Sequence, residues 1–450
     1  MIAFLGFITV VGMLALIMTK RASPIIALIA TPVITALLAA FFITNDAGVV
    51  NVLTNILNIP RWISAGIGTV AATGVMFIFS VLTFSILYDA GTFRPIINGV
   101  LGGVGGDPIK IALGTALLAM LTHLDGSGAT TFLICIPPLL PIYKAVGMRS
   151  TTLATIVALA AGTMNMVPWG GPTIRAATAI DITVMNLWIP VIPAQIAGLL
   201  CVFIIAFFLG KSEKARLGAT LSDIAAHGGQ QVLTDEEKAL HRPKMFPVNI
   251  LLLVLMLVAL IGGGQIGIGP AVVFMLIFVL VLIINYPTPQ QQRERIDANA
   301  KAAIMMASVI FAAGAFSGIM RGSGMITEMA LALVNLIPSE LGRMFPIIVG
   351  VISMPASLLF DPDSFYFGVL PTLAATAEGL GVEAINVARS AILGQMTTGF
   401  PVSPLTPATF LLVGLAGVEF GEHQKRTIPF AFGITIVMLI VSLITGGIRI

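Results

Sequence analysis

The sequence predicts an all-helical protein that crosses a membrane many times and is built from two inverted repeats. An apolar composition, long uncharged segments and the same order of features in both halves support this fold class. Of the 450 residues, 57% are hydrophobic and only 10% are charged, whereas a soluble domain carries about 25% charged residues. Uncharged segments such as 2–19 and 24–44 approach the roughly 20 residues with which a helix spans a bilayer. They are too long for membrane strands.

The first apolar segment is interpreted as a retained helix and not as a signal peptide. Lys20 and Arg21 follow the segment, and no basic residue precedes it, which is the reverse of a signal peptide. Cys135 and Cys201 both lie in apolar segments, so neither a disulfide nor a cysteine metal site is expected. The net charge of +3 does not indicate nucleic-acid binding, because most basic residues lie in predicted loops.

A hydrophilic stretch divides the chain into two similar parts. We expect a first repeat over 1–210, a cytoplasmic linker over 211–246 and a second repeat over 247–450. Asp125 precedes Pro168 by 43 residues, and Asp361 precedes Pro404 by the same 43 residues, a matched spacing that indicates duplication. Each repeat should contain three spanning helices, a hairpin with a polar tip and a helix broken by Pro and Gly, at 2–19, 24–44, 66–89, tip 123–131 and 150–185, then at 247–262, 269–286, 300–320, tip 359–366 and 384–419.

The distribution of basic residues predicts that the repeats are inverted. With the N-terminus outside and Lys20 and Arg21 in the cytoplasm, 17 of the 23 Lys and Arg residues fall on the cytoplasmic side, as the positive-inside rule requires. Four fall outside: Arg61, Arg321, Arg343 and Arg449. The first hairpin then enters the membrane from the cytoplasm and the second from outside. This arrangement is typical of secondary transporters, in which both broken segments meet near the midplane.

The two tips and the two breaks predict a binding site for a small, strongly anionic solute. Non-helical backbone at membrane depth is tolerated only where protein or a cavity satisfies its polar groups, and the start of a helix favours an anion. Arg175 follows the first break and is expected to bind a carboxylate, although an arginine that snorkels to the surface is the alternative. Further candidate ligands are side-chain hydroxyls and amides, and the backbone of glycines and a proline, in the first tip and the two breaks. They are Ser127, Gly128, Thr130, Asn165, Gly170, Gly171, Thr173, Ser403, Pro404, Thr406 and Thr409.

Four titratable residues at the tips are candidates for proton or cation coupling. His123 and Asp125 form one possible proton relay, with a structural cap as the alternative for both residues. Asp361 and Asp363 occupy the second tip, where either can carry a proton or cap the following helix, and Asp363 is the favoured functional residue. Asp125 and Asp363 are candidate metal ligands, unless the metal is held through the substrate.

Four blocks of the sequence carry a resemblance to a known family. DGSGATT, MNMVPWGGPTIRA, DSFYFGVLP and SPLTPATFLLVGLAGVEFGEHQKRT resemble the signatures of the citrate–metal:proton symporters, a branch of the ion transporter superfamily. The resemblance covers nearly the whole chain. It implies a homodimer in the bacterial inner membrane, in which a transport domain moves as an elevator against a scaffold domain.

The same resemblance implies the cargo and its ligands. The cargo would be citrate in complex with a divalent cation such as Mg²⁺ or Ca²⁺, imported with protons and without a permanently bound cofactor. Asp125, Gly126 and the first-break residues would form one binding lobe, and Asp363 with Ser403, Pro404 and Thr406 the other. The family tip commonly reads Asp-Gly-Asp-Gly-Ser-Thr-Thr. Here Ser127 replaces the second Asp and Ala129 replaces the Ser, which leaves the metal and the number of protons open.

Other functions remain as alternatives. The first is a proton- or sodium-coupled transporter of another di- or tricarboxylate. An anion channel and an intramembrane enzyme are less favoured, because inverted halves are seldom needed by enzymes and the sequence contains no HExxH, GxSxG or DDxxD-type motif. The protein is therefore predicted not to be an enzyme.

Overall fold

The computed structural model describes residues 1–19, 21–44, 49–95, 99, 106–217, 235–262, 267–335 and 339–450. Lys20 and residues 218–234 of the predicted linker lie outside these ranges. Within them the secondary structure is helical, and the only β-type pairing is an isolated bridge between Thr44 and Val50. The predicted all-helical fold is confirmed.

Each half of the chain contains a helical hairpin followed by an interrupted helix. The first half consists of α1 (Ile2–Met18), α2 (Pro24–Ala39), α3 (Val52–Asp89), α5 (Pro108–Thr122), the short turn η1 (His123–Asp125), α6 (Gly128–Val146), α7 (Ser150–Met164), α8 (Gly171–Ala179), α9 (Val184–Trp188), η2 (Ile189–Val191) and α10 (Ile192–Leu217). The second half consists of α11 (Asp235–Leu240), η3 (Pro243–Met245), α12 (Phe246–Gly262), α13 (Pro270–Asn285), α14 (Pro289–Gly322), α15 (Met325–Val334), α16 (Ser339–Gly342), α17 (Phe345–Ala356), η5 (Ser364–Val369), α18 (Leu370–Gly379), α19 (Ala384–Ile392), η6 (Gly394–Thr398), η7 (Phe400–Val402), α20 (Pro407–Ala416) and α21 (Phe420–Ile444).

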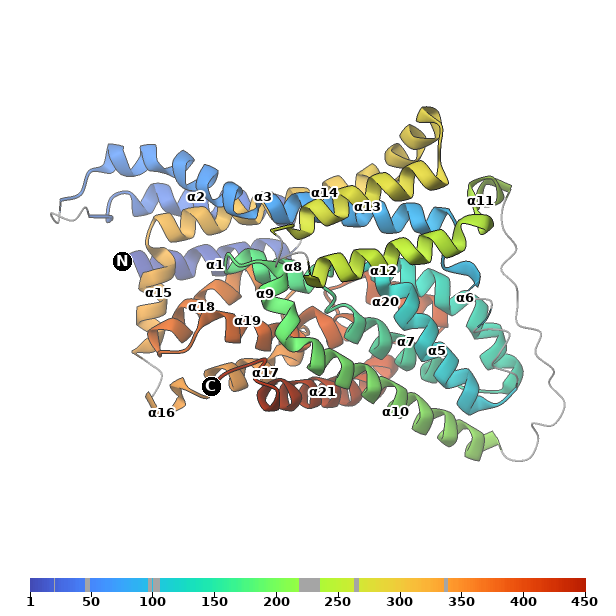
Figure 1. Ribbon diagram of the computed structural model, residues 1–450. Coiled ribbons are helices and arrows are strands. Elements are labelled where there is room, and N and C mark those ends of the chain that lie inside the picture. Colours follow the sequence, from blue (N-terminus) through green and yellow to red (C-terminus); the bar gives the residue numbers. More distant parts are fainter. Residues whose placement is uncertain are drawn as a thin grey trace.

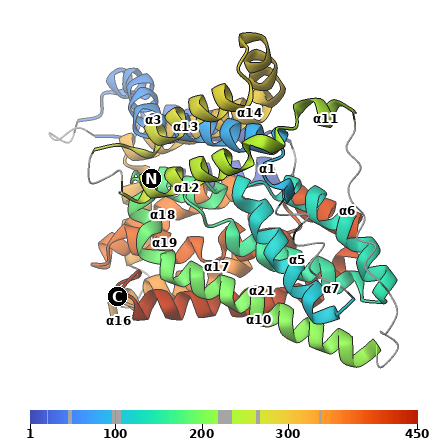
Figure 2. The ribbon, with the colours of Figure 1, turned by 45° about the vertical axis from the view of Figure 1, so that its right-hand side comes forward.

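Long helices from both halves form one layer of the molecule. Figure 1 shows α2, α3, α13 and α14 along the upper side of the view, and Figure 2 keeps α3, α13 and α14 together after the turn. The closest packing is between α3 and α14. A Cβ atom on Gly66 would lie 2.0 Å from the carbonyl oxygen of Gly314, so only glycine permits this approach. Small residues allow such close helix pairs in membranes.

The hairpins and interrupted helices form a second body beneath this layer. Figure 1 shows α5 and α6 in the right-hand part of the view and α18 and α19 in the left-hand part, with α10 and α21 along the lower side. The arms of the interrupted helices, α7 and α19, are almost wholly buried. The non-helical segments therefore lie inside protein, as backbone at membrane depth requires.

Three predicted helix limits are wrong. The third helix begins at Val52 instead of residue 66, α14 begins at Pro289 instead of residue 300, and the second helix ends at Ala39 instead of residue 44. The early starts have caps: the Thr54 N–H donates to Asn51 Oδ1 at 3.1 Å, and the Gln291 N–H donates to Thr288 Oγ1 at 3.3 Å. The start of α14 lies in polar sequence, where an apolar pattern gives no signal. The start of α3 mixes apolar residues with Thr, Asn and an internal proline, Pro60. The chain leaves α2 in a turn after Ala39, although its residues remain apolar.

The lengths of the helices fit a membrane protein. Among the described residues, six helical segments are long and apolar enough to cross a membrane: Val52–Asp89, Gly128–Val146, Val184–Leu217, Pro243–Leu260, Ala303–Gly322 and Phe420–Ile444. A seventh is added if the pair Ala384–Val402 and Pro407–Ala416, which bends by 45°, counts as one span. Large apolar side chains exposed on these helices, such as Leu200 and Ile204, are suited to contact with lipid.

Candidate functional site

The tip of the first hairpin is a tight turn held by its own side chains. Gly126 adopts a φ of 72°, which glycine reaches without strain. Asp125 Oδ1 accepts the Ser127 N–H at 2.8 Å, and Ser127 caps α6 by accepting the Thr130 N–H at 3.3 Å and the Thr130 hydroxyl at 2.9 Å. Ser127 is therefore the N-cap residue of the second arm, whereas the structural interpretation expected Asp125 in that position; Asp125 instead holds the backbone of Ser127.

His123 links this tip to both interrupted helices. The side chain has no exposed surface, and its Nε2 lies 3.3 Å from Asn165 Oδ1, just after α7. The Asn165 amide nitrogen donates to the Met396 carbonyl at 2.7 Å, in the second interrupted helix. The His123 ring also stacks on Phe400, with ring centroids 5.8 Å apart. Three segments far apart in the sequence thus meet at one imidazole. The structural alternative supposed a hydrogen bond from His123 to backbone, whereas its hydrogen-bond partners here are the side chains of Thr131 and Asn165.

The hydroxyl of Thr131 gives His123 two possible proton arrangements. Thr131 Oγ1 lies 2.8 Å from His123 Nδ1 and also 2.8 Å from the Ser127 carbonyl. Asn165 presents its oxygen to Nε2, so Nε2 carries a hydrogen. If Thr131 donates to Nδ1, the ring is neutral; if Thr131 donates to Ser127, Nδ1 must donate as well and the ring is cationic. The hydrogen-bond geometry alone is thus compatible with either state of the ring.

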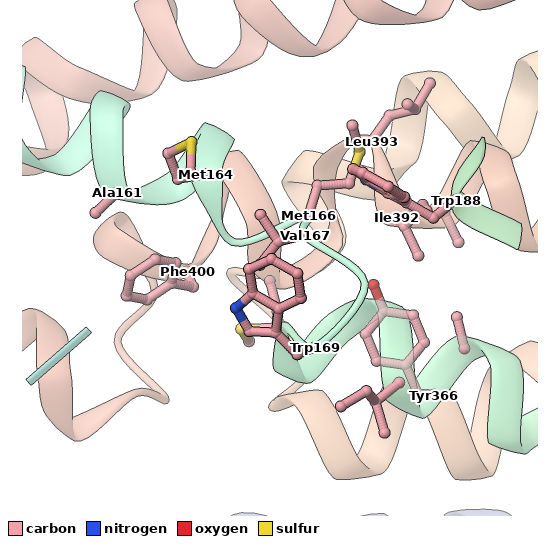
Figure 3. Packing of buried hydrophobic residues seen from close by; sticks show 14 of the residues in the cluster. Ala161, Met164, Met166, Val167, Trp169, Trp188, Tyr366, Ile392, Leu393 and Phe400 are labelled. Atoms are coloured by element: carbon pink, nitrogen blue, oxygen red, sulfur yellow. The ribbon is translucent and has the colours of Figure 1, made fainter. Parts of the chain in front are cut away.

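The first break, residues 165–170, is sealed by an aromatic side chain. The Trp169 indole N–H donates to the Leu124 carbonyl at 2.5 Å, and its ring packs on Phe84 and Phe274 at centroid distances of 5.3 and 5.8 Å. Figure 3 shows Trp169 projecting from the segment between the two helical arms, with Phe400 on one side of it in this view and Tyr366 on the other. Trp169 therefore wedges the first tip against α3 and α13.

A buried ion pair joins the first interrupted helix to the second tip. Arg175 Nε lies 2.7 Å from Asp363 Oδ1, and each side chain is 10% exposed. Arg175 sits on α8, whose first residue is Gly171 and whose N-cap is Gly170. A Cβ on Gly171 would lie 2.7 Å from Arg175 Nη1, so glycine leaves room for the guanidinium. Two residues predicted separately, one for substrate and one for coupling, are direct partners.

The second break is long and includes a strained residue. Between α19 and α20, Met396 adopts a φ of 51° and a ψ of 20°, a conformation that non-glycine residues rarely adopt. The conformation is held by α17, because Ser357 Oγ accepts the Met396 N–H at 2.9 Å and donates to Gln395 Oε1 at 2.5 Å. The Tyr366 hydroxyl donates to the Gln395 carbonyl at 2.7 Å. The second tip and the second break are therefore one packed unit.

A cavity of about 380 Å³ opens beside the second break. It is lined by Ile17, Asp361, Pro404, Leu405, Thr406, Pro407 and Phe410, and thus lies between α1, the second tip and the start of α20. Thr406 is the N-cap residue of α20, so the partial positive charge of that helix start faces the cavity. Pockets for small ligands have volumes of about 300–1,000 Å³.

The predicted site residues divide into three groups. Asp361, Pro404 and Thr406 line the cavity, and Asp361 also caps the second tip by accepting the N–H groups of Asp363 and Ser364 and the Ser364 hydroxyl. Other residues meet at the junction of tips and breaks or in the buried ion pair: His123, Asn165, Arg175 and Asp363. The remaining ones support local backbone: Asp125, Ser127, Gly128, Thr130, Gly170, Gly171, Thr173, Ser403 and Thr409. Among the described residues no group of three or more His, Cys, Asp or Glu side chains is arranged to hold a metal ion.

Sequence reasoning missed the residues that hold the second break. Gln395 and Ser357 are fully buried and bond to each other, and Phe400 stacks on both His123 and Phe132. A buried amide in the apolar run AILGQMTTGF was a signal in the sequence, because uncompensated amides are costly at membrane depth. The Arg389 guanidinium, on α19, donates to the carbonyls of Gly447 and Asn186.

Comparison with a solved structure identifies the class of protein. The fold matches the crystal structure of the Alcanivorax borkumensis YdaH transporter with a TM-score of 0.63 over 95% of this chain and 98% of that one, at 13% identity. The chain thus shares the fold of that transporter over nearly its whole length.

Sequence comparison then identifies the family. The family model described as citrate transporter matches residues 13–394, and the protein belongs to this family. A Bacillus subtilis (strain 168) protein named "Citrate transporter" is 42% identical over 447 residues, 99% of both chains. A second protein of that strain, "Mg(2+)/citrate complex secondary transporter", is 40% identical over 450 residues, 100% of both chains. The predicted resemblance is confirmed, and the protein is a transporter and not an enzyme.

Proposed function

We propose that this protein is a secondary transporter that imports citrate in complex with a divalent cation, coupled to protons. A relative with 40% identity over its whole length is named for the Mg²⁺/citrate complex. Fully ionised citrate carries three negative charges, and a divalent cation reduces the net charge to one. The complex is therefore less costly to move into a low-dielectric site than the free anion. The metal is part of the cargo, so the protein needs no metal cage of its own.

The observation that carries this proposal is the cavity at the start of α20. Its lining combines the Thr406 hydroxyl, the positive end of a helix and one carboxylate, Asp361. A helix start favours the citrate oxygens, and a carboxylate favours the bound cation. We propose that Asp361, Pro404 and Thr406 contact the complex, with Arg175, Asn165 and the first tip completing the site when the carrier rearranges.

The ion pair supplies a route for proton coupling. Arg175 Nε donates to Asp363 Oδ1, which uses one face of a guanidinium that also suits a substrate carboxylate. We propose that a proton taken up on Asp363 releases Arg175 to bind citrate, and that loss of the proton restores the pair and expels the anion. His123 is the second candidate carrier, because the hydrogen-bond geometry around its ring is compatible with either protonation state.

The remaining architecture follows the same proposal. The layer that contains α3 and α14 would act as the scaffold and the body with the hairpins as the moving transport domain of a homodimer. The two repeats, 1–210 and 247–450, would be inverted about the linker 211–246, with the N-terminus outside the cell. Because both breaks are packed inside the body that contains the hairpins, the site between them would move together with that body.

Uptake of labelled citrate into proteoliposomes tests the proposal. Uptake should require Mg²⁺, Ca²⁺ or Zn²⁺ at a concentration at which the cation–citrate complex forms. The uptake rate should also rise when a pH gradient is imposed. A matching Na⁺ gradient is the control for sodium coupling. If citrate is not taken up with any cation while succinate or malate is taken up strongly, the substrate is another carboxylate and not citrate. Linear uptake that never accumulates the solute would indicate a channel.

A further inference from the structure

The segment Gly421–Lys425 (GEHQK) contains two side chains that reach into the second break. His423 and Gln424 lie in the first turns of α21, outside the tips and breaks. His423 Nε2 lies 2.8 Å from the Pro401 carbonyl, and the Gln424 side-chain amide donates to the Val402 carbonyl at 2.9 Å. His423 has no exposed surface. Both side chains therefore bond to consecutive carbonyls of the short 3₁₀ turn η7.

The carbonyls of this segment need partners because the backbone N–H groups of a continuous helix are removed by prolines or diverted to side chains. In a helix the carbonyls of Phe400 and Ser403 would accept from residues 404 and 407, but both are prolines without an N–H. The hydroxyls of Thr406 and Thr409 replace them at the Phe400 carbonyl, each at 2.8 Å. The Leu405 N–H is diverted to Ser403 Oγ at 3.1 Å and so does not serve Pro401. An unpaired carbonyl at membrane depth is costly, and α21 supplies the two missing donors.

His423 also connects the second break to the first interrupted helix. A carbonyl can only accept, so Nε2 carries the hydrogen and Nδ1 accepts from the Thr427 hydroxyl at 3.3 Å. The Thr427 oxygen lies 2.9 Å from the hydroxyl of Thr155 on α7, which must then be the donor. The hydrogen bonds run in one direction from α7 through Thr427 and His423 to Pro401. The same α7 helix ends at Asn165, which bonds to Met396 at the other end of the second break.

We propose that His423 and Gln424 are positioning residues, which hold residues 400–406 so that Thr406 and the start of α20 face the substrate cavity. This proposal rests on the proposed function, and it gives His423 and Gln424 a role in binding without contact to the cargo. Neither side chain lines the cavity. Loss of either donor should release the backbone of the break and weaken binding, while the rate at saturating substrate changes less.

Four single variants separate this role from a general structural one. His423→Leu removes the ring donor, and Gln424→Glu keeps the shape of the side chain but replaces the donor with an acceptor. His423→Gln retains an N–H that can reach Pro401. Lys425→Gln, at an exposed neighbouring position, is the matched control. Each is purified as the full chain and compared for hydrogen exchange of the backbone amides in 402–406 without substrate, and for KM and maximal uptake rate per folded protein.

The proposal predicts faster exchange of these amides in His423→Leu and Gln424→Glu, with KM for Mg²⁺–citrate raised about tenfold and the maximal rate within about twofold. His423→Gln should recover most of the wild-type KM, and Lys425→Gln should match wild type. Unchanged exchange in both donor-loss variants would overturn the proposal, as would faster exchange with an unchanged KM.

The experiment distinguishes the two proposals. If the wild-type protein carries no citrate with any cation, the proposed function fails, whereas the exchange rates still show whether α21 holds the break. If His423→Leu does not fold, Gln424→Glu decides the outcome, because Gln424 is only partly buried and its replacement has the same size.

Discussion

The break after α7 and the break after α19 each interrupt a buried helix, yet different groups surround them. The first is closed by Trp169, which bonds to Leu124, and its following helix carries Arg175 in a buried ion pair. The second is followed by a helix whose start faces a cavity of about 380 Å³, with Thr406 at its edge. Side chains hold both breaks, and the helix start after the second break faces a cavity.

This difference indicates a division of labour between the two helix starts. Under the proposed coupling, the ion pair beside the closed break would hold the charge that a proton redistributes, whereas an open helix start can accept an anion directly. Asn165 and His123 connect the two, because they join the first tip and the first break to Met396 and Phe400. Variants at the first break should therefore affect stability and coupling, and those at the second break should affect binding.

The largest effect is expected at the ion pair. Arg175→Gln leaves Asp363 buried without its partner, a change that costs about 3–5 kcal/mol in buried pairs, so uptake should be lost and the Tm should fall. The double variant Arg175→Gln/Asp363→Asn removes both charges and should recover most of the Tm without recovering uptake. Thermal unfolding and proteoliposome uptake check both. Uptake near the wild-type rate in the double variant would mean that the pair is only structural.

A smaller loss is expected where the two breaks are joined. Asn165→Asp keeps the oxygen that faces His123 but removes the donor to Met396, which should reduce uptake about 10- to 100-fold because a buried carbonyl loses its partner at a cost of about 1–3 kcal/mol. Asn249→Asp is the matched control, since Asn249 is also fully buried and bonds to Asn285 and Thr92 away from the breaks. The control should lower stability without raising KM. Equal KM values in Asn165→Asp and Asn249→Asp would argue against a role in binding for the contact between Asn165 and Met396.

Two threonines compare the closed and the open helix start directly. Thr406→Val removes a hydroxyl at the cavity and should raise KM roughly three- to tenfold, equivalent to about 1 kcal/mol. Thr173→Val removes a hydroxyl that donates to the Met166 carbonyl inside the first break and should lower Tm while KM changes little. Saturation curves and thermal unfolding of both variants measure the contrast. The reverse pattern would place the substrate at the first break.

The smallest effect is expected at the start of α5, away from both breaks. Asp107 caps α5 by accepting the Ile109 N–H at 3.0 Å and lies 3.1 Å from Lys214. Burial alone would raise the pKa of Asp107, but the Ile109 N–H and the charges of Lys214 and Lys110 lower it below 3.8. A lowered folded pKa gives stability that is present above the unfolded value, about 3.9, and is lost as the pH falls through the folded value.

Asp107→Asn should accordingly show a slightly lower Tm at pH 7, because Asn also caps helices and an exposed ion pair contributes little. The difference should shrink as the pH falls below the unfolded value, about 3.9, and vanish below the lower folded pKa, and uptake should be unchanged. Thermal unfolding between pH 3 and pH 7 measures it. A difference that grows at acid pH would contradict the sign of the pKa shift.

The sequence was sufficient for the interrupted helices and the hairpins because Gly, Pro and Asp stand out within apolar segments. It also marked Arg175, since a charge in such a segment is rarely without function. It did not reveal that Arg175 pairs with Asp363, because the two are far apart in the chain and only the packed structure brings them together. The start of α14 was missed for a different reason: its polar residues give no apolar pattern to follow. The start of α3 was missed because Asn, Thr and Pro60 interrupt the apolar pattern there.

The central claim is that the tips and breaks of both halves build one site for the metal–citrate complex. An experimental structure of the purified protein with Mg²⁺ and citrate tests it most directly. The account predicts density for the complex beside Thr406 and Asp361, at the start of α20. Density for citrate at the α3–α14 layer or in the loops, with this cavity empty, would contradict it.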